Sequence, residues 1–509
     1  MDRLNRVFSL IASVFLLTFQ LSGCGRITEV IPNSSQTSLS PDTYEYTLET
    51  SDTSSYSETS VPYQSEDITA LSEITETYSL SEEIGDISET DLSSSTEAAQ
   101  TAVSTEQNEE EADVTSVEAT AETTVSAVSE AVLSEAETAV ETTYETAQTD
   151  TYYPVNSYYT LNYSVQKAVW VSYLEYDRIM SGKTREEFSE ALCECFDNIA
   201  ALGCNTVYFQ VRAHGDAYYN SALFPTASRL GGEIGGTADY DPLEIAVKTA
   251  HDRGLSIHAW INPMRLMTES EMESLSDDCI LKQWYNDDDK NGQYITLYSG
   301  RWYLNPAYSE VTELICDGIR EIVTGYDVDG IQIDDYFYPT TEEFFDSIAY
   351  TASGTSLSLG DWRRALIDTM VSAMYTTVHS ANSTAVFGIS PQGNADNNYE
   401  NLYADTVKWC SEGGYCDYIC PQVYYGFENE TLSFAETADQ WSEYVSDSGV
   451  ALVIGLAAYK VGAEDTYAGT GKHEWEENSD VLFRQQEYAE ELGAGYAFFR
   501  YDSLFEDGE

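Results

Sequence analysis

Short apolar segments alternate with amphipathic stretches beyond residue 165 of the 509-residue chain. Eight segments have the length and alternation of strands, at residues 168–176, 206–212, 256–262, 330–335, 385–391, 418–425, 451–458 and 495–501. Helices are expected between them, for example at residues 184–202, after the capping pair Thr184 and Glu187, and at residues 241–253, beginning with Asp241. Eight such repeats predict a (β/α)₈ TIM barrel. A doubly wound sheet fits less well, because no Gly-rich phosphate loop follows the first strand.

Alternation within the strands predicts which side chains face the barrel axis, because outward residues must be apolar to pack on the helices. The residues predicted to point inward are Tyr208, Gln210, Arg212, His258, Trp260, Asn262, Gln332, Asp334, Gln422 and Tyr424. Toward the C-terminal ends of the strands this inner surface is polar and aromatic, and barrel enzymes place their chemistry there. We interpret His258, in mid-strand, as part of a hydrogen-bonded interior.

Asp334 is the main catalytic candidate, because it combines the inward position with the C-terminal end of the fourth strand. A buried carboxylate costs several kcal/mol unless it is paired. Arg212 or Arg265 is the expected partner.

The first 24 residues have the pattern of a secretory signal. Arg3 and Arg6 precede an apolar run at residues 7–21, and the run ends in Leu-Ser-Gly-Cys at residues 21–24. The run is short for a membrane span of roughly 20 residues. The tetrapeptide resembles a bacterial lipobox, which implies that Cys24 carries a lipid and anchors an extracytoplasmic protein to the cell membrane. An ordinary signal with an incidental cysteine is the alternative.

Residues 25–164 are predicted to be a disordered stalk before a barrel domain at residues 165–509. Between residues 21 and 165 there are 29 Asp and Glu but one basic residue, Arg26, among many Ser and Thr. Such a composition cannot form a core. The whole chain has a formal net charge of −65, and the predicted barrel is acidic as well. This charge argues against nucleic acid as a partner.

Eight cysteines follow Cys24, and none has the spacing of a zinc site. Their positions in predicted strands and helices favour buried free thiols over disulfides. The five histidines form no His-x-His or His-x₃-His pair, and no Gly-x-Ser-x-Gly motif occurs. These patterns argue against a metal-dependent deacetylase and a serine hydrolase, and we expect no cofactor.

Several motifs at the strand ends occur together and in order. They are Phe209-Gln210-Val211-Arg212, Gly215-Asp216-Ala217-Tyr218-Tyr219, Ala259-Trp260-Ile261-Asn262-Pro263 with Arg265, Asp329-Gly330-Ile331-Gln332-Ile333-Asp334-Asp335-Tyr336-Phe337-Tyr338-Pro339, Gly388-Ile389-Ser390-Pro391, Pro421-Gln422-Val423-Tyr424 and Gly455-Leu456. In these motifs the sequence resembles the glycosyl-hydrolase-like 10 family. The resemblance implies a barrel enzyme acting on bacterial glycans, including peptidoglycan strands stripped of their peptides. Related barrel families carry one Asp at the position of Asp334, which favours Asp334 over Asp335.

Glycosidases need one protonated and one ionised carboxyl group. We expect Asp334 to be the ionised group. Asp335 is the preferred acid, followed by Asp216, and Glu175 and Glu428 are further candidates. The predicted substrate-binding residues offer flat aromatic faces or hydrogen bonds to sugars. They are Arg212, His214, Trp260, Asn262, Arg265, Tyr336, Tyr338, Gln422 and Tyr424.

Two questions stay open at this point. A carbohydrate-binding lipoprotein without catalysis would keep the same aromatic residues, so it is the alternative function. No eighth helix is evident before Glu509. Either a segment near residues 152–163 covers that flank, or the barrel closes incompletely.

Replacing Cys24 by Ala should release the protein from the membrane into the medium, because the variant lacks the thiol that accepts the lipid. Fractionation of cells followed by immunoblotting measures this. Unchanged membrane retention of the variant would refute lipidation at Cys24.

Overall fold

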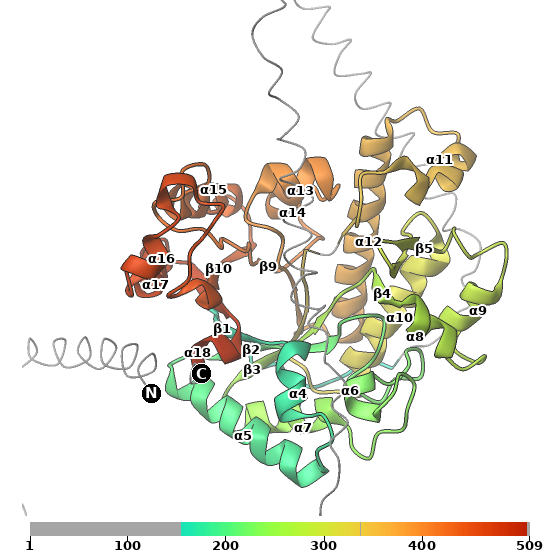
Figure 1. Cartoon of the computed structure of the whole chain (residues 1–509), viewed down its shortest axis with the longest axis horizontal. Helices are drawn as coiled ribbons and strands as arrows, with labels where there is room; N and C mark the ends of the chain where they lie inside the picture. Colours follow the sequence, from blue (N-terminus) through green and yellow to red (C-terminus); the bar gives the residue numbers. More distant parts are fainter. Residues whose placement is uncertain (1–153, 336, 506–509) are drawn as a thin grey trace, which may run out of the picture. The chain divides into compact units, whose positions relative to one another are not determined.

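Eight parallel strands close into a barrel in the computed structural model, which describes residues 154–335 and 337–505 (Figure 1). The strand order around the barrel is β1-β11-β10-β9-β8-β7-β3-β2. The strands are β1 (Lys167–Val171), β2 (Thr206–Arg212), β3 (Ser256–Ile261), β7 (Gly330–Ile333), β8 (Val386–Ile389), β9 (Tyr418–Ile419), β10 (Ala451–Ala457) and β11 (Gly495–Phe499). Each overlaps one predicted segment, so the predicted (β/α)₈ barrel is confirmed.

A helix follows each barrel strand and lies outside the ring (Figure 1). In chain order these helices are α5 (Arg185–Ala201), α7 (Pro242–His251), α10 (Ser309–Gly325), α12 (Leu359–Ala381), α14 (Thr406–Ser411), α15 (Phe434–Val445), α17 (Val481–Glu491) and α18 (Tyr501–Phe505). The predicted caps are present: Thr184 and Glu187 form a capping box on α5, and Asp241 accepts hydrogen bonds from the first turn of α7. Because β1 pairs directly with β11, the expectation of incomplete closure is wrong.

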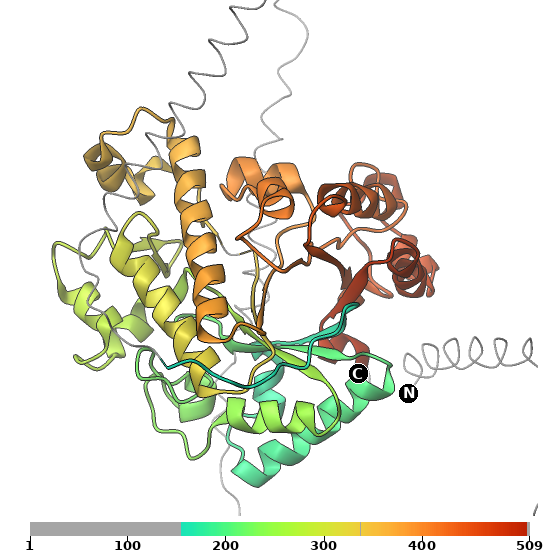
Figure 2. The same cartoon turned by 180° about the vertical axis from the view of Figure 1, so that it is seen from behind.

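Residues 154–165 run across the N-terminal end of the barrel, seen from behind in Figure 2. Their partners precede strands: Tyr163 OH donates to Gly254 O (2.6 Å), and Thr160 Oγ1 donates to Thr384 O (2.6 Å). The buried carboxylate of Asp329 accepts hydrogen bonds from Leu161 N (2.6 Å) and Tyr158 OH (3.0 Å). The assignment of residues 154–164 to a disordered stalk is therefore wrong, and this segment does not cover the flank beside β11.

A second, three-stranded antiparallel sheet is inserted between β3 and α10, which the strand count did not predict. Its order is β4 (Arg265–Thr268), β6 (Arg301–Leu304), β5 (Ile295–Tyr298). The turn between β5 and β6 contains Ser299 and Gly300, both with positive φ (49° and 78°). Positive φ at both central residues suits the right-handed twist of a two-residue hairpin. The sheet places β4 and β6 beside the C-terminal end of β3.

The predicted signal, Cys24 and the stalk up to residue 153 lie outside the described residues. Within residues 154–335 and 337–505, no helix is both long and apolar enough to span a membrane. All eight cysteines after Cys24 are free, and six of them are buried, which confirms the prediction of unpaired thiols.

A protein that begins at residue 154 should match the full chain in the free energy of unfolding of its barrel. One that begins at residue 165 should be less stable by about 2–5 kcal/mol, because the buried Asp329 carboxylate loses the Leu161 and Tyr158 donors. Urea denaturation followed by tryptophan fluorescence measures the difference. Equal stability of the two shortened proteins would contradict a structural role for this segment.

Candidate active site

Large aromatic side chains fill the barrel below the site. Trp170, Tyr208, Trp260 and Tyr418 belong to one buried cluster. Tyr418 OH lies 2.8 Å from His258 Nδ1 and its ring stacks on Tyr208, so the expected hydrogen-bonded interior around His258 is confirmed. The barrel is therefore packed up to the strand ends, and reacting groups are restricted to the C-terminal face.

Asp334 lies at the end of β7 and turns toward β3. Asn262 Nδ2 donates to both of its carboxylate oxygens (2.7 and 2.6 Å), and Trp260 Nε1 donates to Oδ2 (3.1 Å). Asn262 is itself held by Gln210 Nε2, which donates to its Oδ1 (2.8 Å). The predicted inward positions of these residues are confirmed. The side chain of Asp334 is buried, and these N–H donors favour its ionised form.

Asp335 turns to the other side, toward β8 and β9. Gln422 Nε2 donates to its Oδ1 (3.1 Å) and Gln392 Nε2 donates to its Oδ2 (3.2 Å). Gln422 also donates to Ser390 O (3.2 Å). Two consecutive carboxyl groups are thus held apart by donors from opposite sides of β7.

Both carboxyl groups have raised pKa values. Burial is the main cause for each, and the charge of Asp335 raises the pKa of Asp334 further. The hydrogen bonds described above and the charge of Arg265 act in the opposite direction on both groups. The pair therefore favours a state in which one carboxyl keeps a proton while the other is ionised.

Basic side chains lie beside this pair. Arg265 at the start of β4 lowers the pKa of both carboxyl groups, which fits its expected role as a partner of Asp334. The ring of His214 packs edge-on against Tyr173 (4.9 Å between centroids), and Arg229 lies 5.1 Å from the same ring. Tyr173 N donates to Gln210 Oε1 (2.9 Å). Because Gln210 also holds Asn262, this hydrogen bond connects Tyr173, and with it His214 and Arg229, to the Asp334 carboxylate.

Aromatic side chains lie on the side of β9 to β11. Tyr424 contacts Phe499 (5.8 Å between centroids) and packs edge-on against Tyr459 (6.0 Å), which is 46% exposed. Lys460 Nζ fixes this loop by donating to Tyr424 O (2.8 Å) and to Asp465 (2.7 Å). The half-buried Tyr424 thus offers an aromatic face near the two carboxyl groups.

Arg212 is a correction to the sequence prediction. Val211 is an extra residue in β2, because Gln210 pairs with Trp260 whereas Arg212 pairs with Ile261. This bulge reverses the alternation, so Arg212 points outward and stacks on Phe224 (4.3 Å). A Cβ at Gly318 of α10 would overlap the guanidinium. Arg212 is therefore packed between strand and helix, where a substrate cannot reach it.

Tyr338 is also placed differently from the prediction. It is buried, lies 5.0 Å from the guanidinium of Arg363 and packs edge-on against Tyr403 (5.3 Å). Arg363 in turn forms a buried ion pair with Asp346 (2.6 Å). Tyr338 therefore anchors the loop after β7 and offers no face to a sugar. Tyr336 lies outside the described residues.

The other carboxylate candidates are engaged elsewhere. Asp216 accepts backbone hydrogen bonds from Ala213 (3.2 Å) and His214 (2.9 Å), and burial raises its pKa. Glu175 is buried in an ion pair with Arg500 (2.5 Å), and Glu428 is exposed. None of the hydrogen bonds and ion pairs of these described side chains reaches Asp334 or Asp335.

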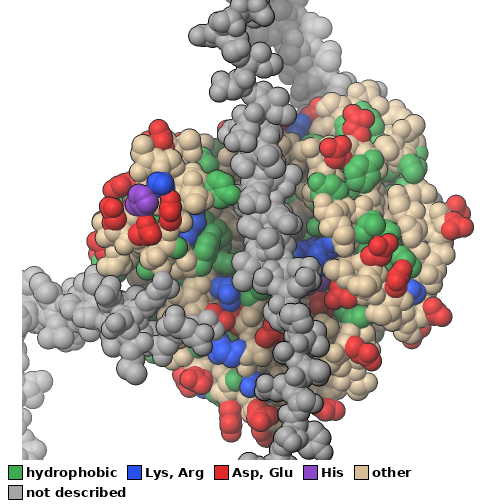
Figure 3. Space-filling view, in the orientation of Figure 1, with side chains coloured by type: hydrophobic (Ala, Val, Ile, Leu, Met, Phe, Trp, Pro, Cys, Tyr) green, Lys and Arg blue, Asp and Glu red, His purple; other side chains and the backbone are tan. Residues whose placement is uncertain are grey.

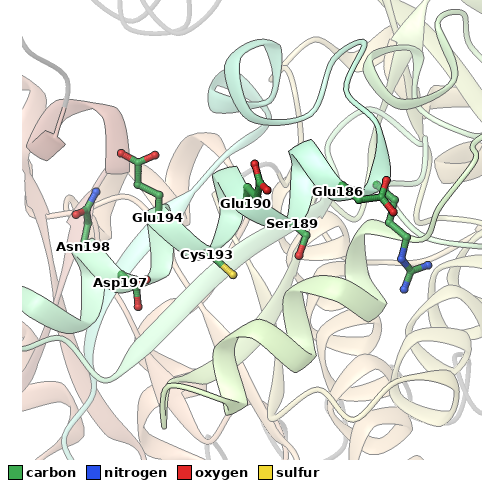
Figure 4. A pocket seen from close by; sticks show the side chains of 8 residues that line it. Glu186, Ser189, Glu190, Cys193, Glu194, Asp197 and Asn198 are labelled. Atoms are coloured by element: carbon green, nitrogen blue, oxygen red, sulfur yellow. The ribbon is translucent and has the colours of Figure 1, made fainter. Parts of the chain in front are cut away.

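Figure 3 shows several Lys and Arg side chains toward the middle of this face, with Asp and Glu side chains both near them and around the edge. A separate depression of about 680 Å³ lies along α5 (Figure 4). One helix lines it, with four carboxylates among its residues, and it shares no residue with the site. Among the described residues, no group of three or more His, Cys, Asp or Glu could hold a metal ion.

Sequence reasoning missed Gln392, a donor to Asp335, and Arg301, whose charge lowers the pKa of His214. Gln392 follows the predicted fifth strand, and continuing the alternation by one residue could have indicated it. Arg301 comes from the inserted sheet, for which the strand count gave no signal.

Comparison with known families identifies the chain. A family model described as Glycosyl hydrolase-like 10 matches residues 166–469, which include both Asp334 and Asp335. The chain belongs to this family. The resemblance seen in the motifs is thereby confirmed.

Two family relatives are similar in sequence. Glycosyl hydrolase YngK of Bacillus subtilis (strain 168) is 34% identical over 318 residues, covering 58% of this chain and 61% of that protein. Glycosyl hydrolase DigH of Escherichia coli (strain K12) is 32% identical over 292 residues, covering 54% and 66%. The chain therefore spans less than two thirds of the length of these relatives.

Among solved structures, alpha-L-fucosidase isoenzyme 2 from Paenibacillus thiaminolyticus aligns with a TM-score of 0.43 and 14% identity. The alignment covers 67% of this chain and 47% of that one.

The Asp335→Asn variant should gain stability over the wild type as the pH rises. Both carboxyl groups have pKa values above the roughly 3.9 of an unfolded Asp, so the native state binds more protons and loses stability as the pH rises from about 4. The variant has one such group fewer, so it loses less stability as the pH rises. Its free energy of unfolding should exceed that of the wild type by about 1–3 kcal/mol more at pH 8 than at pH 4. Urea denaturation at both pH values measures it, with Glu428→Gln as the control. A difference that does not change with pH would refute the raised pKa values.

Proposed function

We propose that the protein is a glycoside hydrolase that cleaves glycosidic bonds of a bacterial glycan, with peptide-free peptidoglycan strands as the substrate class. The observation that carries the proposal is the pair at the end of a barrel strand, in which Asp334 is buried, Asp335 is half-buried and both have raised pKa values. Hydrolysis of a glycosidic bond requires one protonated and one ionised carboxyl group in one site.

The hydrogen bonds suggest how the roles divide. Asp334 accepts from Asn262 and Trp260 at 2.6–3.1 Å, whereas the donors to Asp335 lie at 3.1–3.2 Å. Closer N–H donors stabilise a carboxylate more strongly. Burial and the charge of Asp335 act against this by raising the pKa of Asp334 to about 8. Because the closer donors select the carboxylate form, we nevertheless assign the ionised role to Asp334, which attacks the anomeric carbon or activates water. Asp335 holds the proton and delivers it to the leaving oxygen.

Three further observations support a glycan substrate. The relatives YngK and DigH are named glycosyl hydrolases. The face of Tyr424 can pack against a sugar ring, while Gln422 and Asn262 belong to types that hydrogen-bond hydroxyl and acetamido groups. We also propose that Cys24 anchors the protein outside the cell membrane, where such glycans occur.

Asp334→Asn should lower hydrolysis at least about a thousandfold while folding persists, because an amide can neither attack nor accept a proton. Release of new reducing ends from a panel of wall and capsule glycans measures activity, and circular dichroism checks the fold. Sugar binding should persist.

Two control variants test whether the loss of activity is specific to Asp334. Glu428→Gln removes an exposed carboxylate and should leave turnover unchanged. Asp335→Asn should reduce activity but spare part of it on substrates with good leaving groups, which need less help from an acid. Near wild-type turnover by Asp334→Asn would overturn the site. A wild-type protein that binds glycans without releasing reducing ends would instead be a carbohydrate-binding lipoprotein.

A further inference from the structure

Arg301 is a basic residue at this face that the proposed catalytic roles leave unused. It begins β6 in the inserted sheet and is half-buried. Its Nη1 donates to Leu266 O (3.0 Å), and within residues 154–335 and 337–505 it forms no ion pair. A partly buried guanidinium without a carboxylate partner is costly, and an anionic ligand would remove that cost.

Arg301 belongs to a group of cationic side chains that repel one another. In the antiparallel pairing of β4 with β6, Arg265 lies opposite Tyr303, the second residue after Arg301. Burial together with the charge of Arg265 lowers the pKa of Arg301. Burial and the charges of Arg265, Arg301 and Arg229 lower the pKa of His214 well below its usual range. His214 Nε2 is buried and has no hydrogen-bond partner among the described residues. The fold thus concentrates positive charge around Arg301 and His214, in a chain whose formal net charge is −65.

This cationic group lies next to the two catalytic candidates. The charge of Arg265 acts on both Asp334 and Asp335. On the other side, the contact of His214 with Tyr173 continues through Gln210 and Asn262 to the Asp334 carboxylate. A ligand that contacts Arg301 and Arg265 would therefore lie beside the reacting groups.

We propose that Arg301, together with Arg265, forms a subsite for a carboxylate carried by one sugar of the glycan. The inference rests on the proposed function and adds to it a residue that sets substrate preference. The aromatic side chains Tyr424 and Phe499 lie on the opposite side, at β9 to β11, and suit an uncharged ring. The substrate would thus be oriented, with an acidic sugar toward β4 and β6 and a neutral sugar toward β9.

The proposed substrate class favours a carboxylate over a phosphate. Guanidinium groups pair well with either anion. In the peptide-free strands of the proposed function, the lactyl group of the muramyl sugar supplies such a carboxylate.

The test measures binding by the full chain carrying Asp334→Asn, so that the ligand is not consumed. The probes are a muramyl disaccharide with a free lactyl carboxyl group, its methyl ester and a phosphate-bearing disaccharide, titrated by calorimetry. The free acid should bind more tightly than the ester. Adding Arg301→Gln should weaken binding of the acid by about 10- to 100-fold and leave the ester unchanged, because a hydrogen-bonded charge is lost.

Two further variants separate binding from a structural role. Arg301→Lys keeps the charge and should restore part of the preference for the acid. Arg185→Gln removes an exposed arginine on α5 and should change nothing. Equal weakening of acid and ester by Arg301→Gln would assign the residue to the sheet alone and overturn the proposal. Equal affinity of the parent for acid and ester, no binding of either, or tighter binding of the phosphate would overturn it as well.

Failure of this proposal can be distinguished from failure of the proposed function. Hydrolysis of neutral and acidic glycans at equal rates by the wild type would support the hydrolase and overturn the subsite. Binding that depends on the carboxylate and on Arg301, without release of reducing ends by the wild type, would support the subsite and overturn the hydrolase.

Discussion

The site depends on one constraint. Two consecutive carboxyl groups, one buried and one half-buried, lie at the end of β7, and each needs its own N–H donors. A single neighbouring strand cannot supply both. Asp334 therefore takes donors from β3 and the residue after it, whereas Asp335 takes donors from the loops after β8 and β9. The closed ring is what brings these segments to the two sides of β7. Loop residues such as Lys460 act indirectly, because they fix the backbone that carries Tyr424.

Much of the fold and the centre of the site followed from periodicity. The eight barrel strands, the caps of α5 and α7, and the inward positions of Trp260, Asn262 and Asp334 all depend on local alternation or on near neighbours in sequence. Such signals are present in any single sequence, because apolar faces must meet the helices outside the barrel.

The errors arose where tertiary structure overrides the local pattern. A bulge at Val211 turns Arg212 outward, and alternation has no means of marking an extra residue. Arg301 belongs to a sheet inserted after β3, for which the strand count gave no signal. Tyr338 packs against Arg363, which is close in space but far along the sequence. Residues 154–164 lack periodicity of their own and are ordered by Asp329, so composition alone placed them in the stalk.

Residues 154–165 are attached at the end of the barrel opposite the candidate active site. The segment crosses the N-terminal end of the barrel, and Asn156 Nδ2 donates to Val323 O (3.0 Å) and Tyr326 O (3.1 Å) where α10 leads back to β7. Asp334 lies at the opposite end of the same strand. Tension applied through the backbone at residue 154 would therefore load the hydrogen bonds of Asn156 first and the contacts around Asp329 next. It would pull on the N-terminal end of the barrel, while Asp334 and Asp335 lie at the C-terminal end.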